Sequence, residues 1–518
     1  MSRKPRLDAL AWSIRLEQGS QKRLVSHDGV PPHHRANTGN NPWCSMKPSS
    51  MSQTTAEGLG SGNTGRPGKW WVLLAVGVGT FMSALDGSIV NTVLPVINHS
   101  FGSSVATIEW VITVYLLVVS GMLLSFGRLG DLHGHKPVYC SGFGMFVFGS
   151  VLCGMAPTVT ALICFRSLQA LGAAMLFANS PAILTRNFPA EQRGRALGLQ
   201  ATMTYLGLTV GPSLGGWLTE QFNWRTVFYV NVPIGLLALS LSLHFIPGDS
   251  PVEGTKRFDL AGAITFVGGL VGLLLGLNKG HDWGWTSPAI LLSLVLAVVL
   301  LCAFVLIEQR VSNPMLELSL FQHRLFSAAA ASAVLNYICV YSNVFLLPFY
   351  LIRGRGLGPA QAGLLLTAQP LIMAVVAPLS GAISDRIGSR LPTTLGMGIL
   401  AAGLFLLSRL DPQSPLAEVT VALAITGLGT GVFVSPNSSA LMGSAPTQQR
   451  GVAAGILATA RLVGMVLGVG LAGAIFTTIL SHGQATGRGL ALFDGIHAGF
   501  LVASAVAVLG VVVSAVRE

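Results

Sequence analysis

Long apolar segments recur along this sequence, and they constrain its fold more than any other feature. Each is close to the length of about 20 residues that a helix needs to cross the hydrocarbon core of a bilayer. Only 10% of the residues are charged, whereas soluble domains carry about 25%. We therefore exclude a water-soluble globule and predict an all-α integral membrane protein. Fourteen transmembrane helices are expected, at 71–97, 107–127, 137–156, 158–180, 196–218, 226–246, 260–278, 287–307, 326–351, 360–382, 391–408, 416–436, 451–479 and 497–515.

Charge is distributed unequally along the chain. If the amino terminus is inside, twelve Lys and Arg residues lie in the inner loops and six in the outer loops, which predicts that both termini are cytoplasmic. Residues 1–68 are polar, lack a signal-peptide core and are predicted to be a disordered cytoplasmic tail. Met51 begins a more ordinary lead-in to the first helix, which indicates that the first fifty residues are an over-extended start.

The net charge of +11 does not indicate a nucleic-acid partner. More than half of it, +6, comes from residues 1–70, and neither a basic face interleaved with aromatic residues nor a zinc-finger spacing is present. Five of the six cysteines lie in or beside apolar segments, and there is no CxxC pair. We expect buried thiols, with no metal site and no disulfide framework.

Two short motifs each occur twice at nearly the same spacing. GRLGDLHGHK from Gly127 returns as GAISDRIGSR from Gly381, and QRGRALG from Gln192 returns as QRGVAAG from Gln449, at offsets of 254 and 257 residues. This repetition predicts two similar helical bundles joined in one chain. The expected units are a first six-helix bundle (69–247), two inserted helices with their linkers (248–325) and a second six-helix bundle (326–518).

The repeated loop resembles the signature G-x-L-x-D-R-x-G-R-K of the major facilitator superfamily. LDGSIVNTVLP from Leu85, RSLQALG from Arg166, GLTVGPSLGG from Gly207 and WRTVFYVNVPIG from Trp224 extend the resemblance. Together with the inserted helices, they resemble the fourteen-helix branch of drug:proton antiporters, over about residues 70–518. The resemblance implies the major facilitator fold, multidrug efflux and a role in antibiotic resistance.

Asp86 and Arg166 are the strongest candidates for proton coupling. Asp86 lies about 22 Å into the first segment, where a carboxylate must face water, carry a proton or have a cationic partner. Arg166 lies about 12 Å into the fourth segment from the opposite side, at a similar depth. The two side chains can therefore share one cavity. For both residues, a purely structural role in hydrogen bonding between helices is the alternative.

The fifth segment carries glycines at helical spacing. Gly207, Gly211 and Gly215 lie on one face and permit close helix approach, while Pro212 removes a backbone hydrogen bond. With Gly216 they match an antiporter signature of the resembling family, although tight packing alone also explains the glycines. Arg461, in the second bundle, is interpreted as a structural cation.

The repeated loop predicts a cytoplasmic latch between the bundles. Its glycines allow tight reversals, and its acids can bond a helix terminus or a cation. Leu132 and His135 replace the usual arginines of the family, which predicts a first latch weaker than is typical, while the second follows the family pattern better. His133 and His135 are expected to be solvated. The latch residues are Gly127, Asp131, Gly134 and Lys136, and then Asp385, Arg386, Gly388 and Arg390.

Uncharged polar residues within apolar segments are candidates for the wall of a substrate cavity, because polar groups avoid lipid. They are Ser88, Asn91, Tyr115, Gln169, Asn336, Tyr337, Tyr341, Asn343 and Gln369.

The leading interpretation is a secondary transporter of the plasma (inner) membrane that exports drugs or small apolar molecules in exchange for protons. Its partners are the small-molecule substrate, protons and the lipid bilayer. We expect no cofactor, since the proton gradient drives transport and no G-x-x-x-x-G-K-[ST] loop is present. Import or exchange of a polar metabolite on the same fold is the alternative. A membrane-embedded enzyme is disfavoured because H-E-x-x-H and G-x-S-x-G are absent, and a non-transporting receptor gives no reason for Asp86.

Overall fold

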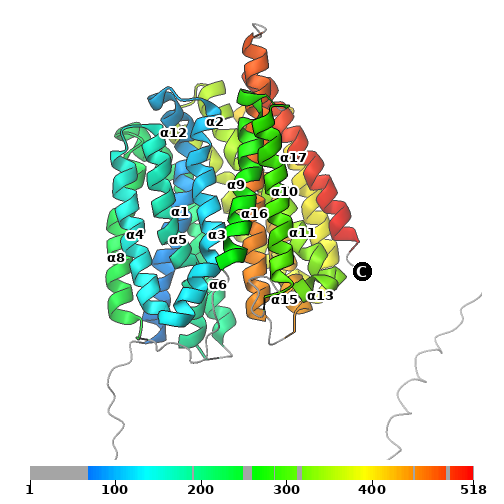
Figure 1. Cartoon of the computed structure of the whole chain (residues 1–518). Helices are drawn as coiled ribbons and strands as arrows, with labels where there is room; N and C mark the ends of the chain where they lie inside the picture. Colours follow the sequence, from blue (N-terminus) through cyan, green and yellow to red (C-terminus); the bar gives the residue numbers. More distant parts are fainter. Residues whose placement is uncertain are drawn as a thin grey trace, which may run out of the picture. The chain divides into compact units, whose positions relative to one another are not determined.

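The computed structural model describes residues 68–189, 192–248, 260–284, 286–311, 318–446, 450–485 and 491–516, and within these ranges the chain is helical, with no strand (Figure 1). Residues 1–67 of the predicted tail lie outside the described ranges. The described N-terminal helices are α1 (Lys69–Phe101), α2 (Val105–Ile108), α3 (Trp110–His133), α4 (His135–Met155), α5 (Val159–Asn187), α6 (Arg193–Gln221), α7 (Thr226–Tyr229) and α8 (Asn231–Phe245). We call α1 to α8 the N-terminal set.

Two helices, α9 (Leu260–Trp283) and α10 (Pro288–Glu308), connect this set to the rest of the chain. The C-terminal set follows: η2 (Leu318–Gln322), α11 (Arg324–Pro348), η3 (Phe349–Gly354), α12 (Pro359–Leu366), α13 (Ala368–Ile387), α14 (Arg390–Leu407), α15 (Leu416–Ser444), α16 (Arg450–Ala485) and α17 (Ala491–Ala515).

Capping residues and glycines set several of the helix ends. The Thr158 side chain accepts a hydrogen bond from the Ala161 amide at the start of α5, and Ser287 does the same for Ile290 at the start of α10. Gly134 and Gly388 follow the last residues of α3 and α13 with φ of 93° and 82°. A residue with a Cβ is strained at such angles, so the glycines permit the tight reversals that the repeated loop predicts.

Twelve helices or helix pairs in the described ranges are long and apolar enough to cross a membrane. Of the fourteen predicted segments, those at 196–218 and 260–278 do not meet this criterion. The first forms the middle of α6, which is rich in Gly and Thr residues. The second has only a short apolar stretch, Ala261–Leu277. Helix α10 is the opposite case, since it is strongly apolar and only 17% buried, as a helix facing lipid should be.

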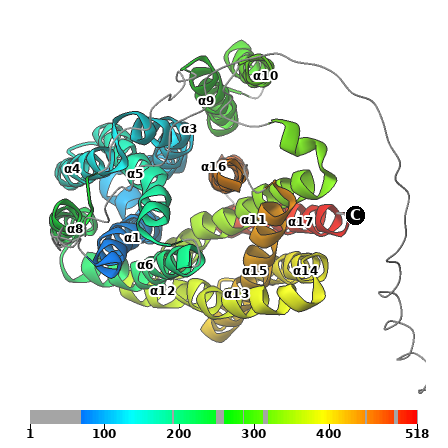
Figure 2. The ribbon, with the colours of Figure 1, turned by 90° about the horizontal axis from the view of Figure 1, so that it is seen from below.

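The two sets use the same packing pattern. In the N-terminal set α1 packs on α6 and α8, and α5 packs on α3 and α4; in the C-terminal set α11 packs on α16 and α17, and α15 packs on α13 and α14. The sets meet where α6 contacts α12 and α13, and where α16 contacts α3. Helices α9 and α10 lie side by side outside this arrangement, with α9 against α3 and α16 (Figure 2).

Candidate functional site: a buried ion pair beside a central cavity

Asp86 lies in the middle of α1, and its side chain is 0% exposed. Its Oδ2 accepts a hydrogen bond from Arg166 Nη1 at 2.8 Å, in a salt bridge between α1 and α5. Its Oδ1 accepts hydrogen bonds from Gln169 Nε2 at 3.0 Å and from Asn231 Nδ2 at 2.7 Å. Both carboxylate oxygens therefore have donors, which a buried charge requires.

Arg166 is 2% exposed and is held on several sides. Its Nη1 also donates to Gln169 Oε1 at 2.7 Å, and its Nε donates to the Val111 carbonyl of α3 at 3.3 Å. The guanidinium carbon lies 4.2 Å from the centre of the Tyr115 ring, a cation–π contact. These contacts fix both the position and the orientation of the cation.

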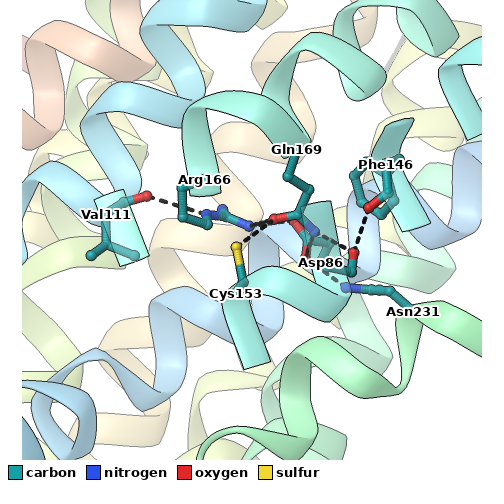
Figure 3. A network of polar contacts seen from close by, with 8 residues as sticks. Asp86, Val111, Phe146, Cys153, Arg166, Gln169 and Asn231 are labelled. Atoms are coloured by element: carbon teal, nitrogen blue, oxygen red, sulfur yellow. Dashed lines mark hydrogen bonds and ion pairs between the residues drawn. The ribbon is translucent and has the colours of Figure 1, made fainter. Parts of the chain in front are cut away.

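Gln169 links this ion pair to α4. Its Nε2 donates to Ser150 Oγ at 2.8 Å, and Ser150 in turn donates to the Phe146 carbonyl at 2.8 Å (Figure 3). Cys153 lies 3.7 Å from Gln169 Oε1. One network thus joins α1, α3, α4, α5 and α8, so a change in the charge of Asp86 bears on five helices.

A cavity of about 1250 Å³ lies between the two sets of helices. Seven of the nine predicted wall residues line it: Ser88, Asn91, Tyr115, Tyr337, Tyr341, Asn343 and Gln369. Gln169 and Asn336 do not. Gln169 belongs to the Asp86 network, and Asn336 is fully buried with its amide 3.4 Å from Met397 Sδ.

Asp86 itself does not line the cavity, whereas Arg166 and Tyr115 do. The cavity therefore reaches the cation of the ion pair but not its carboxylate. Of the three situations expected for a carboxylate at this depth, the structure shows the one with a cationic partner.

The cavity reaches the end of the molecule where the α3–α4 loop lies, since Gly127, Arg128 and Asp131 line it there; we call this the Asp131 end. At the opposite end the sets are bridged. Ser213 and Thr367 hydroxyls are 2.6 Å apart, and the Ala360 amide donates to Glu220 Oε2 at 3.0 Å. In this structure the cavity is therefore connected to one end of the molecule and closed by contacts at the other.

The glycines of the fifth predicted segment pack against α1. A Cβ on Gly207 would lie 2.6 Å from the Phe81 carbonyl, and a Cβ on Gly211 would lie 2.6 Å from Ser88 Cβ. Gly215 packs against Ile89 in the same way, while Gly216 faces Pro359 of α12. This part of α6 thus touches both α1 and the C-terminal set at the bridged end.

Pro212 leaves a backbone carbonyl of α6 without its helical donor, and α1 supplies a replacement. Because proline has no amide proton, the carbonyl of Leu208, four residues earlier, loses its helical donor. Ser88 Oγ of α1 donates to this carbonyl at 3.1 Å. The proline therefore ties α6 to the helix that carries Asp86, and α6 continues through it without interruption.

The first latch makes its contacts within the N-terminal set. Asp131 lies within ion-pair distance of Arg128 at 3.8 Å, His135 at 3.4 Å and Arg186 at 4.0 Å. The hydrogen bond with His135 and the charges of Arg128 and Arg186 hold the pKa of Asp131 below its ordinary value. Lys136 Nζ donates to the Leu243 carbonyl of α8 at 2.9 Å, and Gly127 lies at the cavity mouth.

His135 is not solvated, contrary to the expectation from sequence. It is 3% exposed, and its Nδ1 is 2.7 Å from Asn179 Oδ1. The physical reason is Gly130, where a Cβ would collide with the Asn179 amide and the His135 ring, so that only glycine permits this approach. His133 is exposed as expected.

The residues of the second latch lie at the surface. Asp385, Arg386, Gly388 and Arg390 are all exposed. In the part of the chain that the structure describes, Asp385 has no cation within 4.0 Å. Among the described residues, the ion-pair partners of Asp131 all belong to the N-terminal set, in a conformation in which the cavity is connected to the Asp131 end.

Two members of the Asp86 network, Ser150 and Asn231, are not among the site residues predicted from the sequence. A signal for Asn231 was available, because it lies in the motif WRTVFYVNVPIG. Arg461 was assigned to the second bundle as a structural cation; it lines the cavity, and its Nη2 donates to Ser438 Oγ at 2.8 Å.

This arrangement of helices around a cavity that is closed at one end is that of a membrane transporter. Residues 76–261, 260–469 and 329–517 match the sequence model of the Major Facilitator Superfamily, and the chain belongs to that superfamily. Its relatives and its fold are those of major facilitator transporters, which are not enzymes. The chain is a multi-pass membrane transporter.

Curated relatives include transporters of different substrates. The chain is 35% identical over 417 residues to the riboflavin transporter RibZ of Clostridioides difficile, covering 80% of this chain and 90% of that protein. It is 35% identical over 410 residues to the multidrug resistance protein Stp of Mycobacterium tuberculosis, covering 79% and 76%. Among solved structures, a bacterial homolog of the human lysosomal transporter Spinster superposes with a TM-score of 0.64 at 15% identity, covering 87% of this chain and 97% of the other.

Proposed function

We propose that this protein exports drugs or other small apolar and amphipathic molecules in exchange for protons, by alternating access. The observation that carries the proposal is the buried Asp86–Arg166 pair, whose cation lines a large central cavity beside Tyr115 while its carboxylate does not. Multidrug resistance relatives support the substrate class.

The proposed architecture is two six-helix bundles with α9 and α10 inserted between them, as in the fourteen-helix branch of drug:proton antiporters. Counting α6 and α9 with the twelve apolar spans gives fourteen. Helix α6 is 29 residues long and α9 is 24, both sufficient to cross a bilayer. Polar residues on α6 face the cavity and α1, which explains its low hydropathy without removing it from the membrane. We place both termini in the cytoplasm and the protein in the inner membrane.

Asp86 is the proposed proton carrier. Protonation removes its negative charge and leaves Arg166 without a counter-ion in a buried site, which is costly. Arg166 lines the cavity and contacts Tyr115, so its movement alters the wall that a substrate touches. Substrate binding and proton release are then linked, and each changes the affinity for the other.

Alternating access also requires the cavity to close at the Asp131 end and to open at the bridged end. We propose that the contacts of α6 with α12 and α13 open while the latches at the Asp131 end close, with Asp131 and Asp385 finding partners across the two sets. The proposed axis for this movement is the close α1–α6 contact at Gly207, Gly211 and Gly215.

A second candidate is transport of a polar metabolite by the same fold. It is favoured by the riboflavin transporter among the relatives and by the amides of Asn91, Asn343 and Gln369 on the cavity wall. Direction and coupling distinguish the two functions.

The test uses proteoliposomes containing purified protein, an internal pH dye, and riboflavin, fluorescein and rhodamine 123 as candidate solutes. We expect an imposed pH gradient to drive the movement of at least one solute, with protons moving down their gradient in the opposite direction. Asp86→Asn, which keeps the volume and hydrogen-bonding capacity but cannot titrate near neutral pH, should abolish gradient-driven transport.

Glu220→Gln is the matched control, since it also removes a carboxylate but at the bridged end. It should retain gradient-driven transport even if its rate changes. Undiminished coupling in Asp86→Asn would remove Asp86 from the mechanism and direct attention to Glu109, which is 1% exposed at the start of α3. Solute-dependent proton movement in the same direction as the solute would overturn antiport.

A further inference from the structure

Four charged side chains line the central cavity, and their partners differ. Arg166 is paired with Asp86, and Arg128 and Asp131 lie together at the mouth. Arg461 of α16 is the fourth. In the described part of the chain no carboxylate lies within 4.0 Å of it. The charges of Arg128 and Asp131 cancel, and Asp86 neutralises the charge of Arg166. The positive charge of Arg461 is not balanced in this way, so the cavity carries an excess positive charge there.

Most N–H donors of Arg461 have no hydrogen-bond partner among the described residues. A guanidinium has five N–H donors. Within the described ranges one hydrogen bond is made by Arg461, from Nη2 to Ser438 Oγ of α15, and the side chain is only partly buried. An arginine whose sole role is to connect helices should satisfy its donors with carbonyl or carboxylate oxygens, as Arg166 does. Arg461 instead presents donors to the cavity.

One aromatic ring lies close to this cation, and others line the same cavity. The Arg461 guanidinium carbon is 5.8 Å from the centre of the Tyr337 ring, and Tyr115, Tyr205, Tyr337 and Tyr341, four of the seven tyrosines of the chain, line the cavity. Met373, Met442 and Met465 line it too. Aromatic faces and thioethers accommodate flat rings of varied outline.

The backbone around Arg461 is also tightly placed. Gly464, one turn further along α16, packs so closely on α11 that a Cβ there would lie 2.5 Å from the Val334 carbonyl and 2.8 Å from Tyr337 Cβ. Arg461 and Tyr337 are therefore held together by direct contact of α16 with α11, which makes the pair a preformed subsite.

We propose that Arg461 binds the negatively charged group of the substrate, a carboxylate or an ionised phenol, while the tyrosines hold the attached aromatic ring. The substrate class is then planar aromatic organic anions. This inference rests on the proposed transport function, because it assigns that function's substrate, but it concerns binding and is independent of proton coupling.

The experiment measures equilibrium binding to the full-length protein in lipid nanodiscs, by fluorescence anisotropy, without a pH gradient. Fluorescein, an anion, and rhodamine 123, a cation, share the xanthene ring and differ in charge. We expect the wild type to bind fluorescein more tightly. Arg461→Gln should weaken fluorescein binding about tenfold or more, the effect of losing a charged hydrogen bond, and leave rhodamine 123 within about twofold. Arg461→Lys should restore part of the preference.

Arg409→Gln is the matched control, because it removes the same charge from an exposed position outside the cavity. It should leave both affinities unchanged. Wild-type protein that does not prefer fluorescein, unchanged fluorescein binding in Arg461→Gln, or equal losses for both dyes would each overturn the proposal, the last by showing a structural role. A failure of proton exchange with the dye preference intact would refute the proposed coupling and leave this subsite standing.

Discussion

The N-terminal and C-terminal sets of helices pack in the same pattern but have different polar interiors. In the N-terminal set the centre holds an ion pair, with Asp86 of α1 bound to Arg166 of α5. In the C-terminal set the corresponding part of α11 holds Asn343, whose amide donates to Gln369 of α13 at 2.8 Å. One interior is charged and the other neutral, although the scaffold is repeated.

The two sets thus share a packing framework, and the N-terminal set carries the ion-paired buried carboxylate, Asp86. A charge at this depth is expensive, so a second carboxylate would need a second cation at its side. The C-terminal set has its cation, Arg461, on the cavity wall instead. In the proposed mechanism, proton exchange belongs to the N-terminal set and recognition of the substrate charge to the C-terminal set.

The largest effect should follow from breaking the charged interior. Arg166→Met leaves Asp86 buried without its cation, and we expect a loss of about 3–5 kcal/mol of stability. Thermal unfolding in detergent measures it. The comparison variant Asn343→Leu/Gln369→Leu removes both partners of the neutral contact together, which should cost about 1 kcal/mol or less.

A double variant sharpens this prediction. Asp86→Asn/Arg166→Met removes both charges and should recover much of the stability that Arg166→Met loses. If the double variant is no more stable than Arg166→Met, the cost lies in the packing of Arg166 on Tyr115 and Val111 rather than in the unpaired charge.

Much of the fold could be predicted from the sequence, because hydrophobic length and positive charge in loops are strong signals in membrane proteins. Counting residues placed Asp86 and Arg166 at one depth, and the structure brings them into contact. Helix α6 shows the limit of hydropathy. Its polar side chains lower its average, although one of them, Gln200, lines the cavity and donates to Thr80 of α1 and Ser180 of α5.

Residue roles within the site were harder to predict, since a polar side chain in an apolar segment has several ways to be satisfied. Gln169 and Asn336 were expected on the cavity wall and instead contact other buried groups. His135 was expected in water, yet the missing side chain of Gly130 creates space for it beside Asn179. Such contacts depend on which helices become neighbours, and composition along one helix does not contain that information.

A smaller effect on stability is expected for two serines that are 254 residues apart, Ser88 and Ser342, and it should differ between them. Ser88 Oγ donates to the Leu208 carbonyl, which has no helical donor because of Pro212. Ser342 Oγ lies 2.9 Å from the Ile338 carbonyl of its own helix and 3.2 Å from the Gly468 carbonyl, which retains the amide of Ala472 as a helical donor. Ser88→Ala should cost about 1 kcal/mol or more and Ser342→Ala less. Equal shifts in the unfolding temperature would show that the proline does not leave a carbonyl in need of a partner.

The smallest effect is expected at the two latches. Asp131 is 36% exposed and lies near three cationic or titratable partners, His135, Arg128 and Arg186, so Asp131→Asn should cost about 0–1 kcal/mol at pH 7. Asp385→Asn should cost still less in this conformation, since Asp385 is exposed without an ion-pair partner among the described residues. Unfolding of both variants and the wild type, measured from pH 7 downwards, makes the comparison.

The pH dependence distinguishes an ionic contact from simple packing at Asp131. The pKa of this carboxyl is lowered in the folded protein, so its contribution is complete above the unfolded value of about 3.9 and is lost as the pH falls through the folded value. The difference between wild type and Asp131→Asn should therefore shrink below about pH 4, where the carboxyl becomes protonated. A difference that persists in acid would mean that the Asp131 side chain stabilises the α3–α4 loop by its shape and hydrogen bonding. The two latches would then differ in packing, and the contrast between a charged N-terminal set and a neutral C-terminal set would not extend to the cavity mouth.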